Sequence, residues 1–296
     1  MRRISVKVLL MASLVASTLP APRAAAERDI VVSVLDATNA PVADLAPRDL
    51  VVREDGVARE VLRVRKARTP LSIALLVDDS AASRDAMADI RNGVTAFFDT
   101  LDPRHEVALV TFGDRATVVV DYARDRERLK RGASRLFARD GAGATFLDAV
   151  SDVSRGIEKR SAERPVIVAV MTEGTEFSTL SYQLVLQRLY ASGAQLHALV
   201  LTSEAEANPL AEETRNRNIV LDEGTRGTGG RRDQLLASMA LPGALKELAA
   251  ELENQWIVTY SRPDSLIPPE RVQVEAKREG LVVRARTRLS QAKVSK

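Results

Sequence analysis

The chain has 296 residues, of which 45% are hydrophobic and 28% charged, so it is long enough for one large domain with a small companion, and its composition is not that of a disordered protein. The absence of cysteine excludes disulfides, thiolate metal sites, cysteine nucleophiles and lipid attachment through cysteine. The net charge of +3 becomes −1, with 39 basic against 40 acidic residues, once residues 1–26 are set aside, and this balance argues against nucleic-acid binding.

Residues 1–26 have the three parts of a secretory signal peptide. Arg2 and Arg3 form a charged start, residues 6–19 are mostly apolar, and Ala24–Ala26 supply the small residues that signal peptidase requires. The apolar part is shorter than the ~20 residues needed to span a bilayer. We therefore expect cleavage, a mature chain without a transmembrane span, and a periplasmic or secreted location.

Both ends of the mature chain are predicted to contain short strands. Apolar and polar residues alternate in 30–35, 49–53, 60–64, 255–260, 272–276 and 281–286, and turn residues separate these segments. Three strands alone would expose an apolar face. We therefore expect residues 27–68 and 255–290 to pack together as one small β-sandwich-like module, with 291–296 as a disordered tail. The alternative is two separate β appendages.

The central segment, residues 69–254, alternates strands with helices. The expected strands are 72–77, 106–112, 116–120, 165–172 and 195–201, and the expected helices are 83–101, 125–137, 146–159, 180–192 and 235–252. The link between 106–112 and 116–120 is too short for a parallel crossover, so these two strands form an antiparallel hairpin, the second at a sheet edge. The pattern predicts an α/β fold with a doubly wound, mostly parallel sheet.

Acidic and hydroxyl side chains follow two of the predicted core strands. Asp78, Asp79 and Ser80 come directly after the first, and Glu173 follows the strand 165–172, while Thr145 lies in a glycine-rich loop. Ligands of open α/β sheets bind at the carboxyl ends of the strands, which places these side chains at one edge. Carboxylates and hydroxyls without nearby histidine or cysteine suit Mg²⁺, Mn²⁺ or Ca²⁺.

On these residues, the central segment resembles the von Willebrand factor A domains. Their metal-ion-dependent adhesion site has an Asp-x-Ser-x-Ser loop, a later threonine and an aspartate after the fourth strand. Residues 78–82 (Asp-Asp-Ser-Ala-Ala), Thr145 and Glu173 stand at those places. The resemblance implies a Rossmann-like fold and a metal site formed by Asp78, Ser80, Thr145 and Glu173, at which an acidic side chain of a protein or cell-envelope ligand completes the coordination. The end segments are similar to those of exported bacterial proteins.

Two positions depart from the family pattern. Ala82 replaces the second serine, and Glu173 replaces the aspartate, which lengthens the side chain by one methylene. Mg²⁺ requires near-ideal octahedral geometry, so such changes weaken a site. The alternative to a weakened site is a metal-free domain in which Asp78, Ser80 and Thr145 hold the loops together by hydrogen bonds.

The sequence therefore predicts an exported, non-enzymatic binding or adhesion protein. Two alternatives stay open: an exported metal-dependent hydrolase that uses Asp78, Asp79 and Glu173, and a metal-free structural subunit of the envelope. The two histidines do not favour catalysis, since His105 is expected at the sheet end away from the site and His197 inside a strand.

Three other stretches carry weaker signals. The glycine-rich segment 224–232 is expected to be a flexible surface loop, because it lacks the ending of a phosphate-binding loop. The basic segment 124–139 is expected to be a solvated helix face, with contact to an anionic surface as the alternative. The polar segment 204–217 is expected to be a mobile insertion near the site and a contact for a partner.

Overall fold

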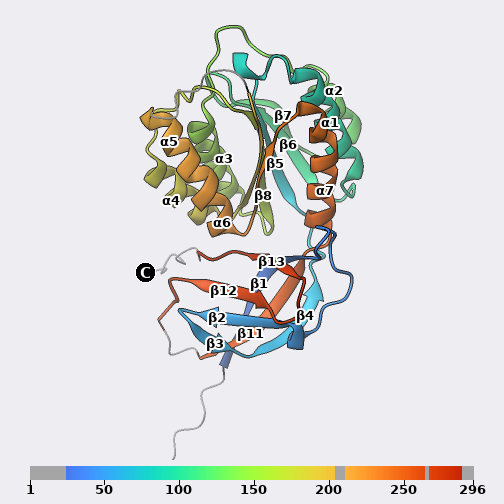
Figure 1. Ribbon diagram of the computed structural model, residues 1–296, viewed down its shortest axis with the longest axis vertical. Helices are drawn as coiled ribbons and strands as arrows, with labels where there is room; N and C mark the ends of the chain where they lie inside the picture. The colour runs from blue at the N-terminus through green and yellow to red at the C-terminus, as the bar shows by residue number, and fades with distance from the viewer. Residues whose placement is uncertain (1–24, 204–210, 264–266, 289–296) are drawn as a thin grey trace, which may run out of the picture.

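The computed structural model describes residues 25–203, 211–263 and 267–288. The predicted signal peptide up to residue 24 and the predicted tail 291–296 lie outside these ranges. Ala25 and Ala26 are the first residues of strand β1, where they pair with Pro263 and Arg262, so cleavage after Ala26 would shorten this strand by two residues. The described chain forms an α/β domain stacked on a smaller β module (Figure 1).

The α/β domain contains a six-stranded sheet in the order β10-β9-β8-β5-β6-β7. Its strands are β5 (Ser72–Val77), β6 (Glu106–Thr111), β7 (Thr117–Ala123), β8 (Pro165–Thr172), β9 (Gln195–Leu201) and β10 (Arg232–Leu235). All neighbours are parallel except β6 and β7, which form the predicted antiparallel hairpin with β7 at the edge. The parallel strands β5, β8 and β9 are buried along their whole length, as expected for strands covered on both faces.

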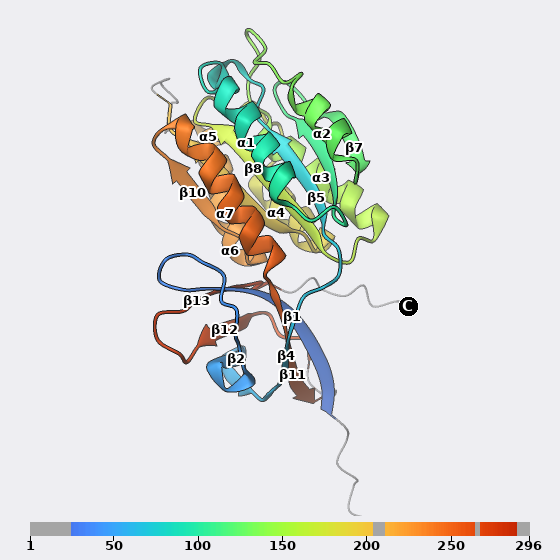
Figure 2. The ribbon, with the colours of Figure 1, turned by 90° about the vertical axis from the view of Figure 1, so that its right-hand side faces the viewer.

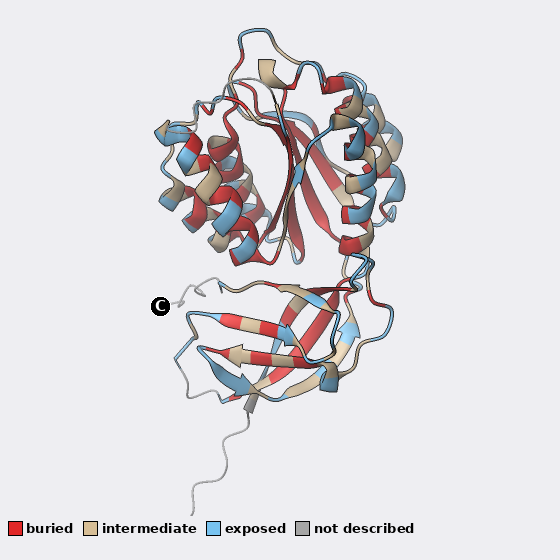
Figure 3. Cartoon of the chain, in the orientation of Figure 1, coloured by how far each residue is buried: buried red, intermediate tan, exposed pale blue. Residues whose placement is uncertain are grey.

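Helices cover both faces of this sheet. They are α1 (Met87–Thr100), α2 (Arg126–Ala133), α3 (Phe146–Arg160), α4 (Tyr182–Ser192), α5 (Glu212–Ile219), α6 (Thr225–Thr228) and α7 (Leu241–Glu253). Apolar residues of α1, α2 and α7 pack on one face, and those of α3 and α4 pack on the other (Figures 1 and 3). This arrangement confirms the predicted doubly wound, mostly parallel α/β fold.

The two ends of the chain together form the β module. A four-stranded sheet, β13-β1-β11-β4, packs against a three-stranded sheet, β12-β2-β3. The strands are β1 (Ala25–Leu35), β2 (Leu50–Glu54), β3 (Val57–Arg59), β4 (Val61–Lys66), β11 (Trp256–Pro263), β12 (Val272–Ala276) and β13 (Val282–Ala285). Each sheet contains strands from both ends of the chain, so neither end could bury its apolar face alone. The predicted β-sandwich-like module is therefore confirmed (Figure 2).

The expectation of a flexible loop at 224–232 is wrong. The segment from Val220 continues as a helical turn into α6, and Arg232 begins the edge strand β10. Its glycines are present for close packing: a side chain at Gly227 would overlap the Tyr190 ring, and one at Gly230 would overlap the Leu196 carbonyl. The glycines that suggested a loop instead allow α6 to approach α4 and the start of β10 to approach β9.

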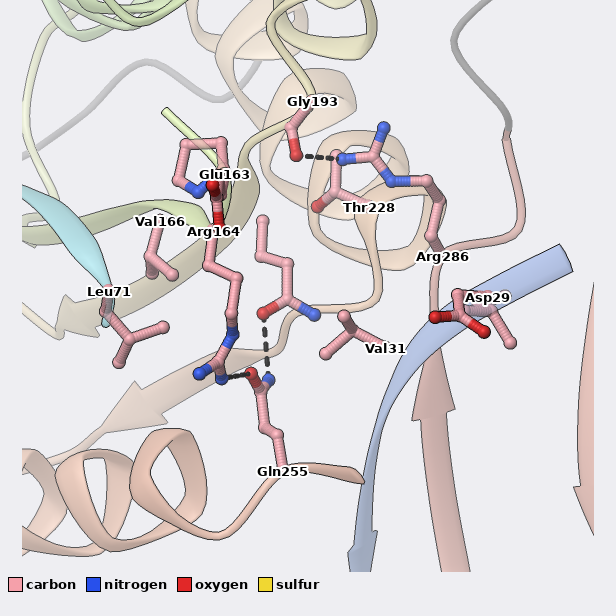
Figure 4. A pocket seen from close by; sticks show the side chains of 13 residues that line it. Asp29, Val31, Leu71, Glu163, Arg164, Val166, Gly193, Thr228, Gln255 and Arg286 are labelled. Carbon is pink, nitrogen blue, oxygen red and sulfur yellow. Dashed lines mark hydrogen bonds between the residues drawn. The ribbon is translucent and has the colours of Figure 1, made fainter. Parts of the chain in front are cut away.

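Arg164 and Gln255 join the two domains. Gln255, between α7 and β11, is buried and donates to Gln195 of β9 (2.8 Å) and to Ser33 of β1 (3.2 Å). The side-chain oxygen of Gln255, Oε1, accepts from Arg164 Nη2 at 2.8 Å (Figure 4). Arg164 is buried without a carboxylate partner among the described residues, and burial lowers its pKa to about 10. Because an unpaired buried charge is costly, the Gln255 oxygen is an important acceptor.

No helix among the described residues has both the length and the apolar character needed to cross a membrane.

Replacement of Gln255 by Leu should destabilise the protein by about 2–3 kcal/mol, because it leaves the buried guanidinium of Arg164 without one of its acceptors. Equilibrium urea unfolding measures this change. The matched control is Gln187→Leu on the exposed surface of α4, which should stay within about 0.5 kcal/mol of the unchanged protein. Equal unfolding midpoints for the two variants would show that the junction does not depend on Gln255.

Candidate functional site

Asp78 lies directly after β5, at the carboxyl-terminal edge of the sheet, and is fully buried. Its Oδ1 accepts from the Ser80 amide at 2.8 Å, and its Oδ2 accepts from the Thr172 amide at 3.1 Å. Burial raises the pKa of this carboxyl group, and the two amide hydrogen bonds partly oppose that rise. Asp78 therefore joins the loop after β5 to the end of β8.

The structure places Ser80 and Thr145 at the same edge. Ser80 Oγ is buried beside the Asp78 carboxylate without a well-formed hydrogen bond. Thr145 is the residue before α3, and its hydroxyl donates to the Phe112 carbonyl at 2.8 Å. The Ala81 amide donates to the Ala142 carbonyl at 3.0 Å and ties the two loops together. Three of the four residues predicted as metal ligands thus lie on loops that contact one another.

Asp79 holds neighbouring loops and does not face the same space. Its Oδ1 accepts from the Gly113 amide at 2.5 Å, and its Oδ2 lies 3.0 Å from Arg139 Nη2. Arg139 also donates to the Gly113 carbonyl. Because both oxygens of Asp79 are engaged in this way, its role is to position the loops after β5 and β6.

Glu173 points toward β10, where its Oε1 accepts from Gln234 Nε2 at 2.9 Å. No hydrogen bond connects it with Asp78 or Thr145 within the described residues. Gly174 follows it and lies so close to Ala82 that a Cβ on Gly174 would come within 2.9 Å of the Ala82 methyl. The loop after β8 therefore packs directly on the position of the missing serine.

Glu176 is the acidic residue of this loop that approaches Asp78, and the sequence reasoning did not select it. Its side chain is buried, and Oε1 accepts from the Leu147 amide in the first turn of α3 at 3.3 Å and from Ser178 Oγ at 2.5 Å. Burial raises its pKa to about 7. Glu176 stands in the same polar stretch as Glu173, but the family pattern directed attention to the residue that follows β8 immediately.

Arg217 brings a positive charge to the same region. It belongs to α5, within the stretch that was expected to be a mobile insertion, and it is buried. Its Nη1 donates to the Gly174 carbonyl at 2.7 Å, and its charge acts on Glu176, Glu173 and Asp78. Burial lowers the pKa of Arg217, and these carboxylates oppose that effect. Residues 204–210 of this stretch lie outside the described residues, and the expectation of a mobile insertion is wrong for the rest, which is helical from Glu212. Arg217 therefore supplies a counter-charge to the site.

A cation fits this site in part. Three of the buried oxygens without a well-formed hydrogen bond lie at this edge: Ser80 Oγ, Thr172 Oγ1 and Glu176 Oε2. Unsatisfied buried oxygens are groups that a cation or an ordered water satisfies. However, within the described ranges no three acidic or histidine side chains converge in the manner of a metal site, and Arg217 already provides one positive charge.

Both histidines lie away from this edge. His105 Nδ1 accepts from the Leu71 amide at 2.9 Å, at the start of β5. His197 is fully buried within β9, and burial lowers its pKa to about 4, so it is neutral at pH 7. Neither imidazole can exchange a proton with a group near Asp78.

Residues 73–175 match the sequence model of the von Willebrand factor type A domain. This segment is therefore similar to a von Willebrand factor type A domain. A search of curated proteins found no match. The matched residues include β5 from Ile73, α1, the loops with Asp78 and Thr145, and β8.

Solved structures share this fold. A von Willebrand factor type A protein from Catenulispora acidiphila superposes with a TM-score of 0.52 and 14% identity, over 92% of this chain and 75% of that one. A mutant of the PilB minor pilin from Streptococcus sanguinis gives 0.49 and 12% identity, over 63% and 62%. The hypothetical protein BatB from Bacteroides thetaiotaomicron gives 0.47 and 13%, over 62% and 100%. At these identities the first match supports the fold alone.

The pH dependence of stability should reveal the buried carboxyl of Glu176. Its pKa is raised from 4.5 to about 7, so its contribution to stability is complete below pH 4.5 and is lost as the pH rises through 7. That shift corresponds to about 3 kcal/mol. Glu176→Gln should remove this loss, so that the variant gains stability relative to the unchanged protein between pH 4.5 and 8.

Urea unfolding at several pH values in EDTA measures this effect. The control is Glu163→Gln, at an exposed glutamate, which should follow the unchanged protein at every pH. Parallel curves for Glu176→Gln and the unchanged protein would contradict the raised pKa of this buried carboxyl group.

Proposed function

We propose that this protein is a non-enzymatic binding module that engages a protein or cell-envelope ligand at the carboxyl-terminal edge of its six-stranded sheet. von Willebrand factor type A domains generally act in this way. The observation that carries the proposal is that the loops after β5, β6 and β8 are tied to one another by Asp78, Asp79 and their amide donors. Such a rigid edge can present a recognition surface with little entropic loss on binding.

Large apolar side chains near this edge support the proposal. Phe177 is 60% exposed, although its ring lies across Gly143, where any side chain would overlap it. Leu236 and Met239, between β10 and α7, are also exposed. Exposed apolar groups above a polar, rigid floor are typical of surfaces that bind other proteins.

The proposal includes a weak divalent cation site. Asp78, Ser80 and Thr145 would hold the ion, and Glu176 is better placed than Glu173 to contribute a carboxylate. When bound, Mg²⁺ or Mn²⁺ would offer an open coordination position to an acidic side chain of the ligand. The engagement of Asp79 by Gly113 and Arg139 favours this role over hydrolysis, because that carboxylate is not free to hold a catalytic ion or activate water.

The proposal also includes export, with residues 1–26 as the signal peptide. The support is the three-part pattern of these residues, together with the absence of cysteine in the whole chain.

Calorimetric titration with Mn²⁺, Mg²⁺ and Ca²⁺ tests the cation site. Ser80→Ala should weaken binding at least tenfold, since it removes an oxygen ligand, but should change stability little, because Ser80 Oγ makes no well-formed hydrogen bond. Ala82→Ser should tighten binding by supplying the missing hydroxyl. If none of the ions gave a heat of binding, the cation site would be rejected. The binding surface is tested separately by the next experiment.

A photo-crosslinking amino acid at Phe177 tests the surface itself. In the cells that produce the protein, this position should yield a discrete protein adduct. The control is the same amino acid at Val57, a 55% exposed position on β3 of the β module, which should yield none. Absence of an adduct at Phe177, or the same adduct at both positions, would contradict the proposed binding edge. Loss of the Phe177 adduct in EDTA would in addition show that binding depends on the cation.

A further inference from the structure

The strand β7 is a free edge of the six-stranded sheet. It pairs only with β6 among the described residues, so the main-chain groups on its other side have no strand partner. Val118 and Val119 in this strand are exposed, at 61% and 36%. Edge strands of natural proteins are usually protected by charged residues, bulges or covering elements. The pairing of β7 with β6 has two register irregularities, one at Val119 and one between Val120 and Ala123, and Asp121 is charged, but the first four residues of β7, Thr117–Val120, carry no charge.

A row of arginines lies beside this edge. Arg128 and Arg131 are on α2, Arg124 comes just before the helix, and Arg135 follows it; we call these four residues the arginine row. All are exposed, and none has a described carboxylate within 4.0 Å. Residues 115–139 contain eight basic and three acidic residues, so acidic neighbours do not neutralise the row. This part of the surface is therefore locally positive although the mature chain as a whole is not.

The arginine row faces away from α1. Lys130, on the other flank of α2, is paired with Asp99 of α1 at 2.5 Å, and Leu129 is buried against the sheet. At about 100° per residue, Arg128 and Arg131 fall on the flank opposite Lys130. Since α2 packs on β6 and β7 as well as on α1, this flank borders the β7 edge (Figure 2).

A cavity of about 240 Å³ connects the two features. It is lined by Thr117 and Val119 of β7 and by residues of the segment after α2, and we call it the α2–β7 groove. The residues of that segment are Arg135, Leu136, Phe137 and Arg139. Phe137 is 64% exposed, and Thr111 of β6 and Asp79 also line the groove. Unpaired main chain, apolar side chains and guanidinium groups are thus available side by side.

We propose that the α2–β7 groove binds an extended acidic segment of a partner protein, which adds a strand to β7 and places its carboxylates on the arginine row. A strand supplies the main-chain donors and acceptors that β7 lacks. Alternate side chains of a strand lie on one side about 6.8 Å apart, a spacing that the long side chains of the arginine row can span. Arginine forks bind carboxylates in a bidentate manner. An anionic membrane surface would attract the arginine row but would leave the main chain of β7 unpaired.

Fluorescence anisotropy with labelled twelve-residue peptides tests this proposal on the complete protein. The peptide (Glu-Val)₆ should bind saturably and protect the β7 amides of residues 117–123 from hydrogen exchange. (Lys-Val)₆ should not bind, because its charge is reversed. (Glu-Pro)₆ should bind at least tenfold more weakly, because proline has no amide hydrogen to pair with β7.

Two charge-reversal variants with equal charge change complete the test. Arg128→Glu/Arg131→Glu should weaken (Glu-Val)₆ binding at least tenfold. Arg215→Glu/Arg226→Glu, which alters two exposed arginines of α5 and α6 on the other face of the sheet, should leave it unchanged. Equal losses in both variants, equal binding of (Glu-Pro)₆, or no binding of (Glu-Val)₆ would overturn the proposal. Binding to phosphatidylserine vesicles without binding to (Glu-Val)₆ would overturn it in favour of a membrane contact.

Discussion

The buried carboxylate of Asp78 is the constraint on which the carboxyl-terminal edge of the sheet depends. A carboxylate removed from water is costly unless hydrogen bonds replace its hydration, and here the amides of Ser80 and Thr172 provide them. These amides belong to the loop after β5 and to the end of β8, which are far apart in the chain but adjacent in the sheet. One side chain therefore sets the position of the loop after β5 relative to β8.

Glu176 is a second buried carboxyl group that holds a loop in place by accepting hydrogen bonds, here the loop after β8. The first amides of a helix have no partner within the helix, and those of α3 meet oxygens from this loop: Leu147 donates to Glu176, and Asp148 donates to Ser178. The Asp148 carboxylate in turn accepts from the amides of Thr179 and Leu180. The start of α3 and the loop after β8 thus hold each other in place. Phe177 is exposed between Glu176 and Ser178, which are both bonded to α3.

The sequence predicted the fold more completely than the site, and the reason is physical. The strands 72–77, 165–172 and 195–201 were located correctly because continuous apolar runs of that length have few other structures available. The strand β10 and the helices α5 and α6 were missed because their sequences are polar or glycine-rich, and their structure depends on packing against β9 and α4. Asp78 could be found because it ends a strand, whereas Glu176 and Arg217 reach the site through loop and helix placement that no local pattern encodes.

The α2–β7 groove and the edge that contains Asp78 share one connection. Arg139 lines the groove, and its guanidinium binds the Asp79 carboxylate and the Gly113 carbonyl, which belong to the loops after β5 and β6. Asp79 and Asp78 are adjacent, so a segment that drew Arg139 toward its own carboxylates would compete directly with the bond that positions the loop after β5. Arg139 also donates its amide to the Asp79 carbonyl. Arg139 and Asp79 are therefore the contacts through which a segment bound in the groove would act on the loop after β5.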